Sequence, residues 1–133
     1  MDISLVAIEF ATKKLQYAGA NNPIYILRNK ELIILKPDKQ AIGSVSEELK
    51  AFTNHEFDLQ TGDLIYMFTD GYADQFGGPD GKKLKYKKFQ DHLITVSEIP
   101  MHEQKNYLKS KFDEWRGTTE QTDDVCVVGI KIT

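Results

Sequence analysis

The chain has 133 residues and a formal net charge of −3, with 41% hydrophobic and 28% charged residues, which describes one soluble globular domain with a single core. The mildly acidic balance, without interleaved basic and aromatic residues, argues against nucleic-acid binding and membrane-surface binding. Cys126 is the only cysteine, so no disulfide forms within the chain and a reducing, cytoplasmic location is expected.

The N-terminal segment predicts strands joined by short turns. Ile3–Phe10 is β-rich and apolar enough for a central strand. Because this strand starts almost at Met1, we expect the chain to begin inside a fold. A polar turn leads to a second strand at residues 15–18, and the Gly, Asn and Pro residues of 18–23 predict a loop.

The next segment continues as an antiparallel meander. Residues 24–27 and 32–35 predict a hairpin in which Asn29 tolerates positive φ. Residues 36–50 are polar and irregular, whereas 52–59 alternate in the manner of another strand.

A five-residue apolar run, Leu64–Phe68, has the length of a fully buried strand. It ends abruptly in Thr69-Asp70-Gly71, with a second carboxylate at Asp74. Such a strand either delivers an acid to hold a ligand or ends in an ordinary Asp-Gly turn, and the local pattern leaves both readings open.

The C-terminal half predicts two helices and a last strand. Tyr86, Phe89 and Leu93 share one face of a short amphipathic helix. A second helix starts near Pro100 and stops at Gly117. Two adjacent carboxylates then open a buried strand over residues 123–132, in which Cys126 is expected to be buried. Taken together, these elements predict an α+β fold, a mostly antiparallel sheet with two helices packed on it.

If the strands at 64–68 and 123–132 are antiparallel neighbours, Asp70 and Asp123 converge on one rim of the sheet. Carboxylates held close together repel each other unless a cation lies between them. Hard oxygen ligands without His or Cys select Mg²⁺ or Mn²⁺. This adjacency therefore predicts a metal site.

Four ordered pieces carry a family resemblance across nearly the whole chain. The chain resembles the C-terminal part of the phosphatase domain of the PPM (PP2C) metal-dependent serine/threonine phosphatases, in their SpoIIE/RsbU-like branch. The pieces are Ala18-Gly-Ala-Asn-Asn-Pro-Ile-Tyr25, Ala41-Ile42-Gly43, Gly62-Asp63 through Thr69-Asp-Gly-Tyr-Ala-Asp-Gln-Phe-Gly-Gly78, and Gln121-Thr-Asp-Asp-Val-Cys-Val-Val-Gly-Ile130.

The resemblance implies a centre of two Mn²⁺ or Mg²⁺ ions that activates a water without a covalent phosphoenzyme. By the match, Asp70 and Asp123 are metal ligands. The resemblance also implies roles for five other residues, as further metal or outer-shell positions and as a substrate rim. These are Gly71, Asp74 and Asp124 for the metal, and Asn21 and Asn22 for the rim.

The chain also departs from the family pattern. It has no Gly-Asp-x-x-Gly segment of the kind whose aspartate bridges both metals in the family; its one Gly-Asp, Gly62-Asp63, belongs to a strand entry. We therefore expect residues 1–133 to be a single partial domain of a PP2C-like αββα sandwich. Whether Met1 is a natural start stays open. Alone, the chain is expected to be weakly active or inactive.

The implied function is dephosphorylation of phosphoserine or phosphothreonine on a bacterial regulatory protein resembling an anti-sigma-factor antagonist. The parent chain would be cytoplasmic or the cytosolic part of a membrane-bound sensor. The alternative is a non-catalytic, phosphatase-like module that binds a partner or forms homo-oligomers through an exposed sheet edge. A third reading is an unrelated α+β domain whose acids merely end strands.

Overall fold

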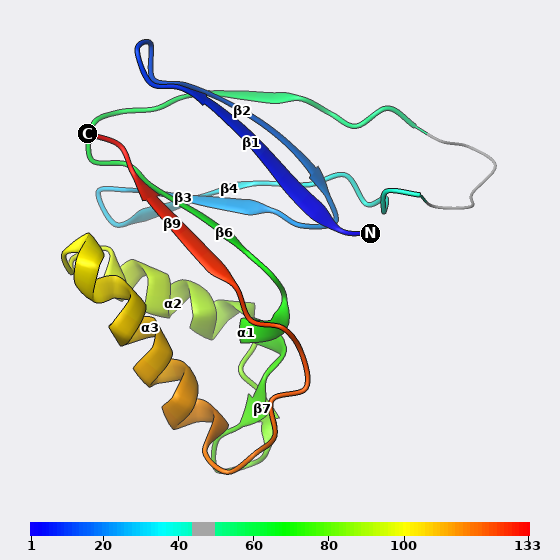
Figure 1. The fold of residues 1–133 in the computed structure, drawn as a ribbon, viewed down its shortest axis with the longest axis vertical. Helices are drawn as coiled ribbons and strands as arrows, with labels where there is room; N and C mark the ends of the chain where they lie inside the picture. The colour runs from blue at the N-terminus through cyan, green and yellow to red at the C-terminus, as the bar shows by residue number, and fades with distance from the viewer. Residues whose placement is uncertain (44–49) are drawn as a thin grey trace.

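The computed structural model describes residues 1–43 and 50–133, which form two stacked antiparallel sheets with helices on one outer face (Figure 1). The strands are β1 (Ile3–Glu9), β2 (Lys14–Ala20), β3 (Ile24–Arg28), β4 (Glu31–Leu35), β5 (His55–Asp58), β6 (Leu64–Phe68), β7 (Phe76–Gly77), β8 (Lys82–Lys83) and β9 (Val127–Lys131). The helices are α1 (Gly71–Asp74), α2 (Tyr86–Val96) and α3 (Met101–Arg116).

Only the hairpins β1–β2 and β3–β4 follow the predicted meander, because β5 pairs with β2 and β6 pairs with β3. The first sheet has the order β1-β2-β5, and the second has the order β4-β3-β6-β9. The β3–β4 hairpin turns through Asn29 at φ 50° and Lys30 at φ 67°, as the Asn29 prediction requires. β7 and β8 form a small separate hairpin.

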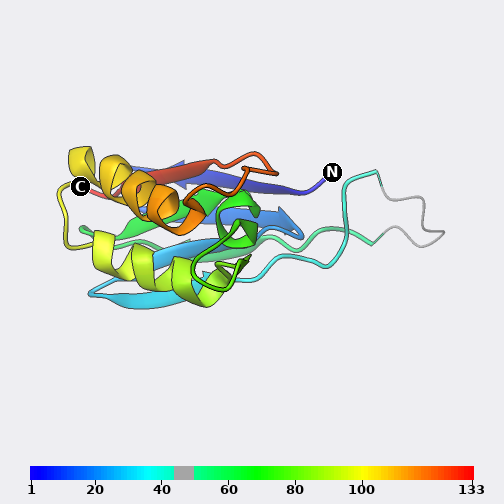
Figure 2. The same ribbon diagram turned by 90° about the horizontal axis from the view of Figure 1, so that it is seen from below.

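Two apolar clusters hold the layers together. One lies between the second sheet and helices α2 and α3, and Phe89, Tyr72 and Phe68 stack at its centre. The other lies between the two sheets and includes Leu15 and Ile65. In Figure 2, which looks from below, α2 and α3 lie in front of the strands.

Helices α2 and α3 bury apolar side chains on one face, and α3 ends where the sequence predicts. α2 buries Phe89 and Leu93 on one face, and α3 buries Leu108 and Phe112. Gly117, at φ 55°, follows α3 directly, which confirms the predicted stop.

The observed layers are sheet, sheet and helix. The outer face of the first sheet carries exposed side chains such as Leu5, which is 66% exposed. Over residues 1–43 and 50–133, therefore, helices cover one face of the predicted αββα sandwich. No helix within these ranges is long and apolar enough to cross a bilayer.

The structure corrects several strand predictions. The first strand was predicted to be central, but β1 lies at the edge of its sheet within the described part of the chain. The last strand was predicted to be buried from residue 123, but β9 starts at Val127. Within the described part of the chain it is also an edge strand, and Val128 is 43% exposed. Cys126 is exposed rather than buried. An apolar run indicates that a strand is buried, but it does not indicate whether one or two strands pair with it. The edge positions of β1 and β9 were therefore not predicted.

Two other predictions fall in the segment between the hairpin and β6. The strand predicted over 52–59 is shorter, because β5 covers only His55–Asp58. Of the irregular stretch predicted over 36–50, residues 44–49 lie outside the described residues.

Candidate metal-binding rim

The C-terminal end of β6 and the N-terminal end of β9 meet at one rim of the second sheet. The strands are antiparallel neighbours, and Phe68 pairs with Val127. The predicted adjacency of the two strands is therefore confirmed. It brings Asp70, two residues beyond β6, to the same rim as Asp123, which lies before β9.

Asp70 lies in an unfavourable electrostatic setting. Desolvation at the rim raises its pKa, and the carboxylates of Asp123 and then Asp74 raise it further. A hydrogen-bonding contribution from the Asp123 side chain raises the pKa of Asp70 as well. Acidic side chains are thus held close together at this rim.

The backbone around Asp70 is tied to the segment that carries Asp123. Thr69 N–H donates to Cys126 O (3.0 Å), and Cys126 N–H donates to Thr69 Oγ1 (3.0 Å). The Thr69 hydroxyl donates to Asp124 O (2.8 Å). A Cβ added to Gly71 would collide with that same carbonyl oxygen.

Asp74, at the end of α1, has a cation of its own. Its carboxylate accepts a hydrogen bond from Lys83 Nζ in β8 (3.1 Å). Tyr86 lies close enough to be affected, because burial and then the charges of Asp70 and Asp74 raise its pKa to about 12. Asp74 thus faces the rim while also pairing with β8.

Two of the lysines near this hairpin make other contacts within the chain. Lys87 pairs with Asp91 (2.9 Å), and the Lys88 ammonium lies 4.1 Å from the centre of the Trp115 ring. These contacts give both lysines structural roles on the helical face.

Asp124 and the two predicted rim residues, Asn21 and Asn22, lie in different parts of the structure. Asp124 is exposed at the rim, and its N–H donates to Asp123 Oδ1 (2.7 Å). Asn21, at φ 59°, hydrogen-bonds through its side chain to Asp2 (2.9 Å). The Asn22 carbonyl accepts from the Tyr17 hydroxyl (2.6 Å). These contacts make Asn21 and Asn22 turn residues, and their role as a substrate rim stays a prediction.

The donor set of the rim fits a hard divalent cation. Asp70 and Asp123 supply carboxylate oxygens whose mutual repulsion a cation would relieve. Within residues 1–43 and 50–133, however, no group of three or more His, Cys, Asp or Glu side chains is placed to hold a metal ion. The rim thus supplies part of a coordination shell.

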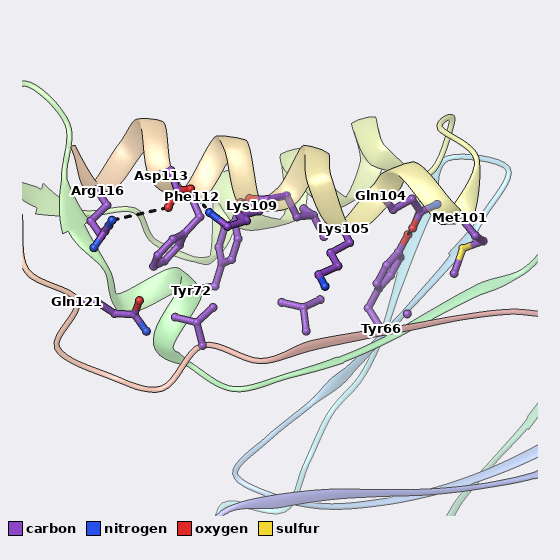
Figure 3. Close-up of a pocket in the computed structure, with 14 residues that line it drawn as sticks. Tyr66, Tyr72, Met101, Gln104, Lys105, Lys109, Phe112, Asp113, Arg116 and Gln121 are labelled. Atoms are coloured by element: carbon purple, nitrogen blue, oxygen red, sulfur yellow. Dashed lines mark hydrogen bonds and ion pairs between the residues drawn. The ribbon is translucent and has the colours of Figure 1, made fainter. Parts of the chain in front are cut away.

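A groove of about 600 Å³ lies between α3 and the second sheet (Figure 3). Tyr66, Val127 and Gly129 line its sheet side. Its lining combines apolar and aromatic side chains with charged side chains of both signs from α3, among them Lys109 and Asp113. The lining residues of α3 include Met101, Gln104, Lys105, Leu108, Lys109, Phe112 and Arg116.

Two of these arrangements were not predicted from the sequence. No role was predicted for the Thr69 hydroxyl, although a Thr that directly precedes an acid at a strand end is a usable signal. Asp63 was read only as part of a strand entry, yet it is buried and paired with Arg28 (2.7 Å). A Gly-Asp entry that follows a hairpin containing an arginine is the signal for that pair.

Solved structures with the same arrangement define the class. The fold is that of PP2C phosphatase domains. The SiaA-PP2C domain of Pseudomonas aeruginosa matches with a TM-score of 0.89 and 29% identity over 99% of this chain. The phosphatase domain of SpoIIE from Bacillus subtilis matches with a TM-score of 0.72 and 17% identity over 98%. RsbX in complex with magnesium matches with a TM-score of 0.59 and 16% identity over 99%.

The sequence profile of the family described as Stage II sporulation protein E (SpoIIE) matches residues 1–133. The chain therefore belongs to the SpoIIE family. A search of curated proteins finds no match. The chain covers 51% of the SiaA domain, 58% of the SpoIIE domain and 56% of RsbX, so it spans somewhat more than half the length of each.

Proposed function

We propose that this chain forms the C-terminal part of a Mg²⁺- or Mn²⁺-dependent protein serine/threonine phosphatase domain. The observation that carries the proposal is the pairing of β6 with β9, which brings the carboxylates of Asp70 and Asp123 to one rim. Membership of the SpoIIE family supports phosphate-ester hydrolysis as the chemistry.

Asp70 and Asp123 are the residues we assign as metal ligands. Asp124, Asp74 and the carbonyl of Gly71 are the nearby groups that could complete the shell directly or through water. When bound, two divalent ions lower the pKa of a water and neutralise charge at the phosphorus. Lys83 pairs with Asp74 beside the rim, at 3.1 Å.

The isolated chain is expected to be weakly active or inactive. A pair of octahedral ions requires more oxygen donors than two carboxylates supply. The substrate we propose is phosphoserine or phosphothreonine on a bacterial regulatory protein similar to an anti-sigma-factor antagonist. We place the reaction in the cytoplasm, in line with the single cysteine, either in a free protein or in the cytosolic part of a membrane-bound sensor.

The proposal is tested by phosphate release from a phosphoserine peptide in millimolar Mn²⁺, with Mn²⁺ binding measured on the same samples. Asp70→Asn and Asp123→Asn should each weaken Mn²⁺ binding and remove the slow turnover. Asp80→Asn, an exposed change of equal charge, serves as the control. Unchanged Mn²⁺ binding in both rim variants would overturn the metal assignment. Fast turnover that Asp70→Asn removes would overturn only the claim of weak activity.

A second candidate function, a homo-oligomerising module, is favoured by the position of β9 at the edge of its sheet within residues 1–43 and 50–133. Hydrogen bonds from Thr69 to Cys126 and from Ile132 to Asp63 turn the even-numbered backbone groups of β9 toward β6. The backbone of Val127, Gly129 and Lys131 therefore faces away from the sheet, and such an edge is open to pairing.

The groove beside this edge has an unsatisfied donor. Among the described residues, Arg116 Nε is buried without a hydrogen-bond partner. A second copy that adds a strand to β9 would also cover Val128. Sedimentation over a range of concentrations tests this module: self-association that Val128→Lys abolishes supports it, and a monomer at all concentrations contradicts it.

A further inference from the structure

Thr69 and Gly71, on either side of Asp70, both contact the backbone carbonyl of Asp124. Asp124 O accepts the Thr69 hydroxyl (2.8 Å), and the Cα of Gly71 packs against it so closely that no Cβ fits. Thr69 and Gly71 flank Asp70, and Asp124 follows Asp123. The contacts of Thr69 and Gly71 with Asp124 therefore fix the backbone next to both candidate metal ligands.

The Thr69 side chain also replaces a rung of the β6–β9 ladder. In a regular antiparallel pair, Cys126 N–H would donate to the backbone carbonyl of Thr69. It donates instead to Thr69 Oγ1 (3.0 Å), while Thr69 N–H keeps its normal bond to Cys126 O (3.0 Å). The carbonyl of Thr69 is released, so the chain can turn into α1 immediately, while β9 stays attached.

Gly71 has a steric reason to be glycine. Its φ is outside the left-handed region, so backbone freedom is not what this position requires. A side chain here would have to displace the backbone of Asp124, since even the carbonyl carbon would lie 2.9 Å from an added Cβ. Because Asp123 directly precedes Asp124, any such shift would change the position of Asp123 relative to Asp70.

We propose that Thr69 and Gly71 are positioning residues that set the separation of the Asp70 and Asp123 carboxylates for a divalent cation. This inference rests on the proposed function, because it concerns the same rim. Thr69 acts through one hydroxyl that both donates and accepts, and Gly71 acts by allowing close approach. Outer groups that orient metal ligands typically contribute about 10- to 100-fold in metal affinity.

The test compares Thr69→Val, which keeps the shape but removes the hydroxyl, with Thr69→Ser, which retains it. Mn²⁺ is titrated into the whole chain, and paramagnetic broadening of backbone amide signals at 69–74 and 122–126 reports binding. We expect Thr69→Ser to bind as the wild type does, and Thr69→Val to bind about tenfold more weakly or worse. Amide hydrogen exchange at Cys126 should speed up only in Thr69→Val.

Gly71→Ala places a methyl group against the same Asp124 carbonyl. It is the second test variant, used if Thr69→Val does not fold. It should weaken Mn²⁺ binding by a similar factor. A folded Thr69→Val or Gly71→Ala variant that binds Mn²⁺ as tightly as the wild type, while Asp70→Asn loses binding, overturns the positioning role and leaves the proposed function intact. If Asp70→Asn has no effect on Mn²⁺ binding, the metal assignment falls, and the positioning role falls with it.

Discussion

The two ends of β6 carry the same residue type in opposite electrostatic settings. At the entry, Asp63 accepts two hydrogen bonds from Arg28 (2.9 and 2.7 Å) and one from Gln60 N–H (2.8 Å). At the exit, Asp70 faces the carboxylates of Asp123 and Asp74. A strand of five residues thus separates an acid with a full set of partners from an acid surrounded by like charges.

The pKa directions follow from these surroundings. Burial alone would raise the pKa of Asp63, but the hydrogen bonds from Arg28 and Gln60 and the charge of Arg28 outweigh burial and lower it. The pKa of Asp70 is raised, by desolvation first and then by Asp123 and Asp74. An ionised acid with a cationic partner and hydrogen-bond donors, such as Asp63, stabilises the fold. An acid held against like charges is typical of a functional site.

The largest expected effect is at the entry of β6. Asp63→Asn should lower the free energy of unfolding by about 2–3 kcal/mol, because it leaves Arg28 without its charged partner. We set this below the cost for a fully buried pair, because the Arg28 side chain is 23% exposed whereas that of Asp63 is 2% exposed. Urea unfolding measures it, with the exposed Asp58→Asn as a control of equal charge. A change below about 0.5 kcal/mol would contradict the structural role.

The same pair predicts a dependence on pH. The folded pKa of Asp63 is lowered, so its contribution is fully present above the unfolded pKa of about 3.9. It is lost as the pH falls through the lower folded value. The stability difference between wild type and Asp63→Asn should therefore be constant near neutral pH and shrink below about pH 4. A difference that grows on acidification would reverse the sign and contradict the pairing.

Local sequence patterns predicted much of the structure around β6, the strand between Asp63 and Asp70. The apolar run Leu64–Phe68 and the stop at Gly117 were read correctly, since burial and a helix end depend on nearby residues. Antiparallel pairing of the flanking strands then brought Asp70 and Asp123 to one rim, as expected.

What escaped prediction depends on contacts between distant parts of the chain. Arg28 and Asp63 are 35 positions apart, and Thr69 and Asp124 are 55 apart, so no sequence window contains either contact. The edge positions of β1 and β9 were missed for the same reason, because an apolar strand does not state how many strands flank it.

At the exit of β6 the expected effect is smaller and has the opposite sign. Asp70→Asn should raise the free energy of unfolding by about 0.5 kcal/mol, because it removes like-charge repulsion at an exposed, solvent-screened position. Measured without divalent cations, the gain should shrink as salt is added. Asp80→Asn, in an exposed turn, controls for net charge. A loss of stability comparable with that of Asp63→Asn would show that Asp70 is a structural acid as well.

Asp74 lies between these extremes, since it faces Asp70 but also pairs with Lys83 at 3.1 Å. Both members of that pair are exposed, at 47% and 37%, and exposed ion pairs contribute little. Lys83→Met should therefore change stability by less than about 0.3 kcal/mol, with Lys82→Met in the same strand as its control. Because the substitution also removes a positive charge near the rim, any Mn²⁺ binding should strengthen slightly. Weaker Mn²⁺ binding in Lys83→Met, with Lys82→Met unchanged, would instead mean that Lys83 helps to orient Asp74 toward the cation.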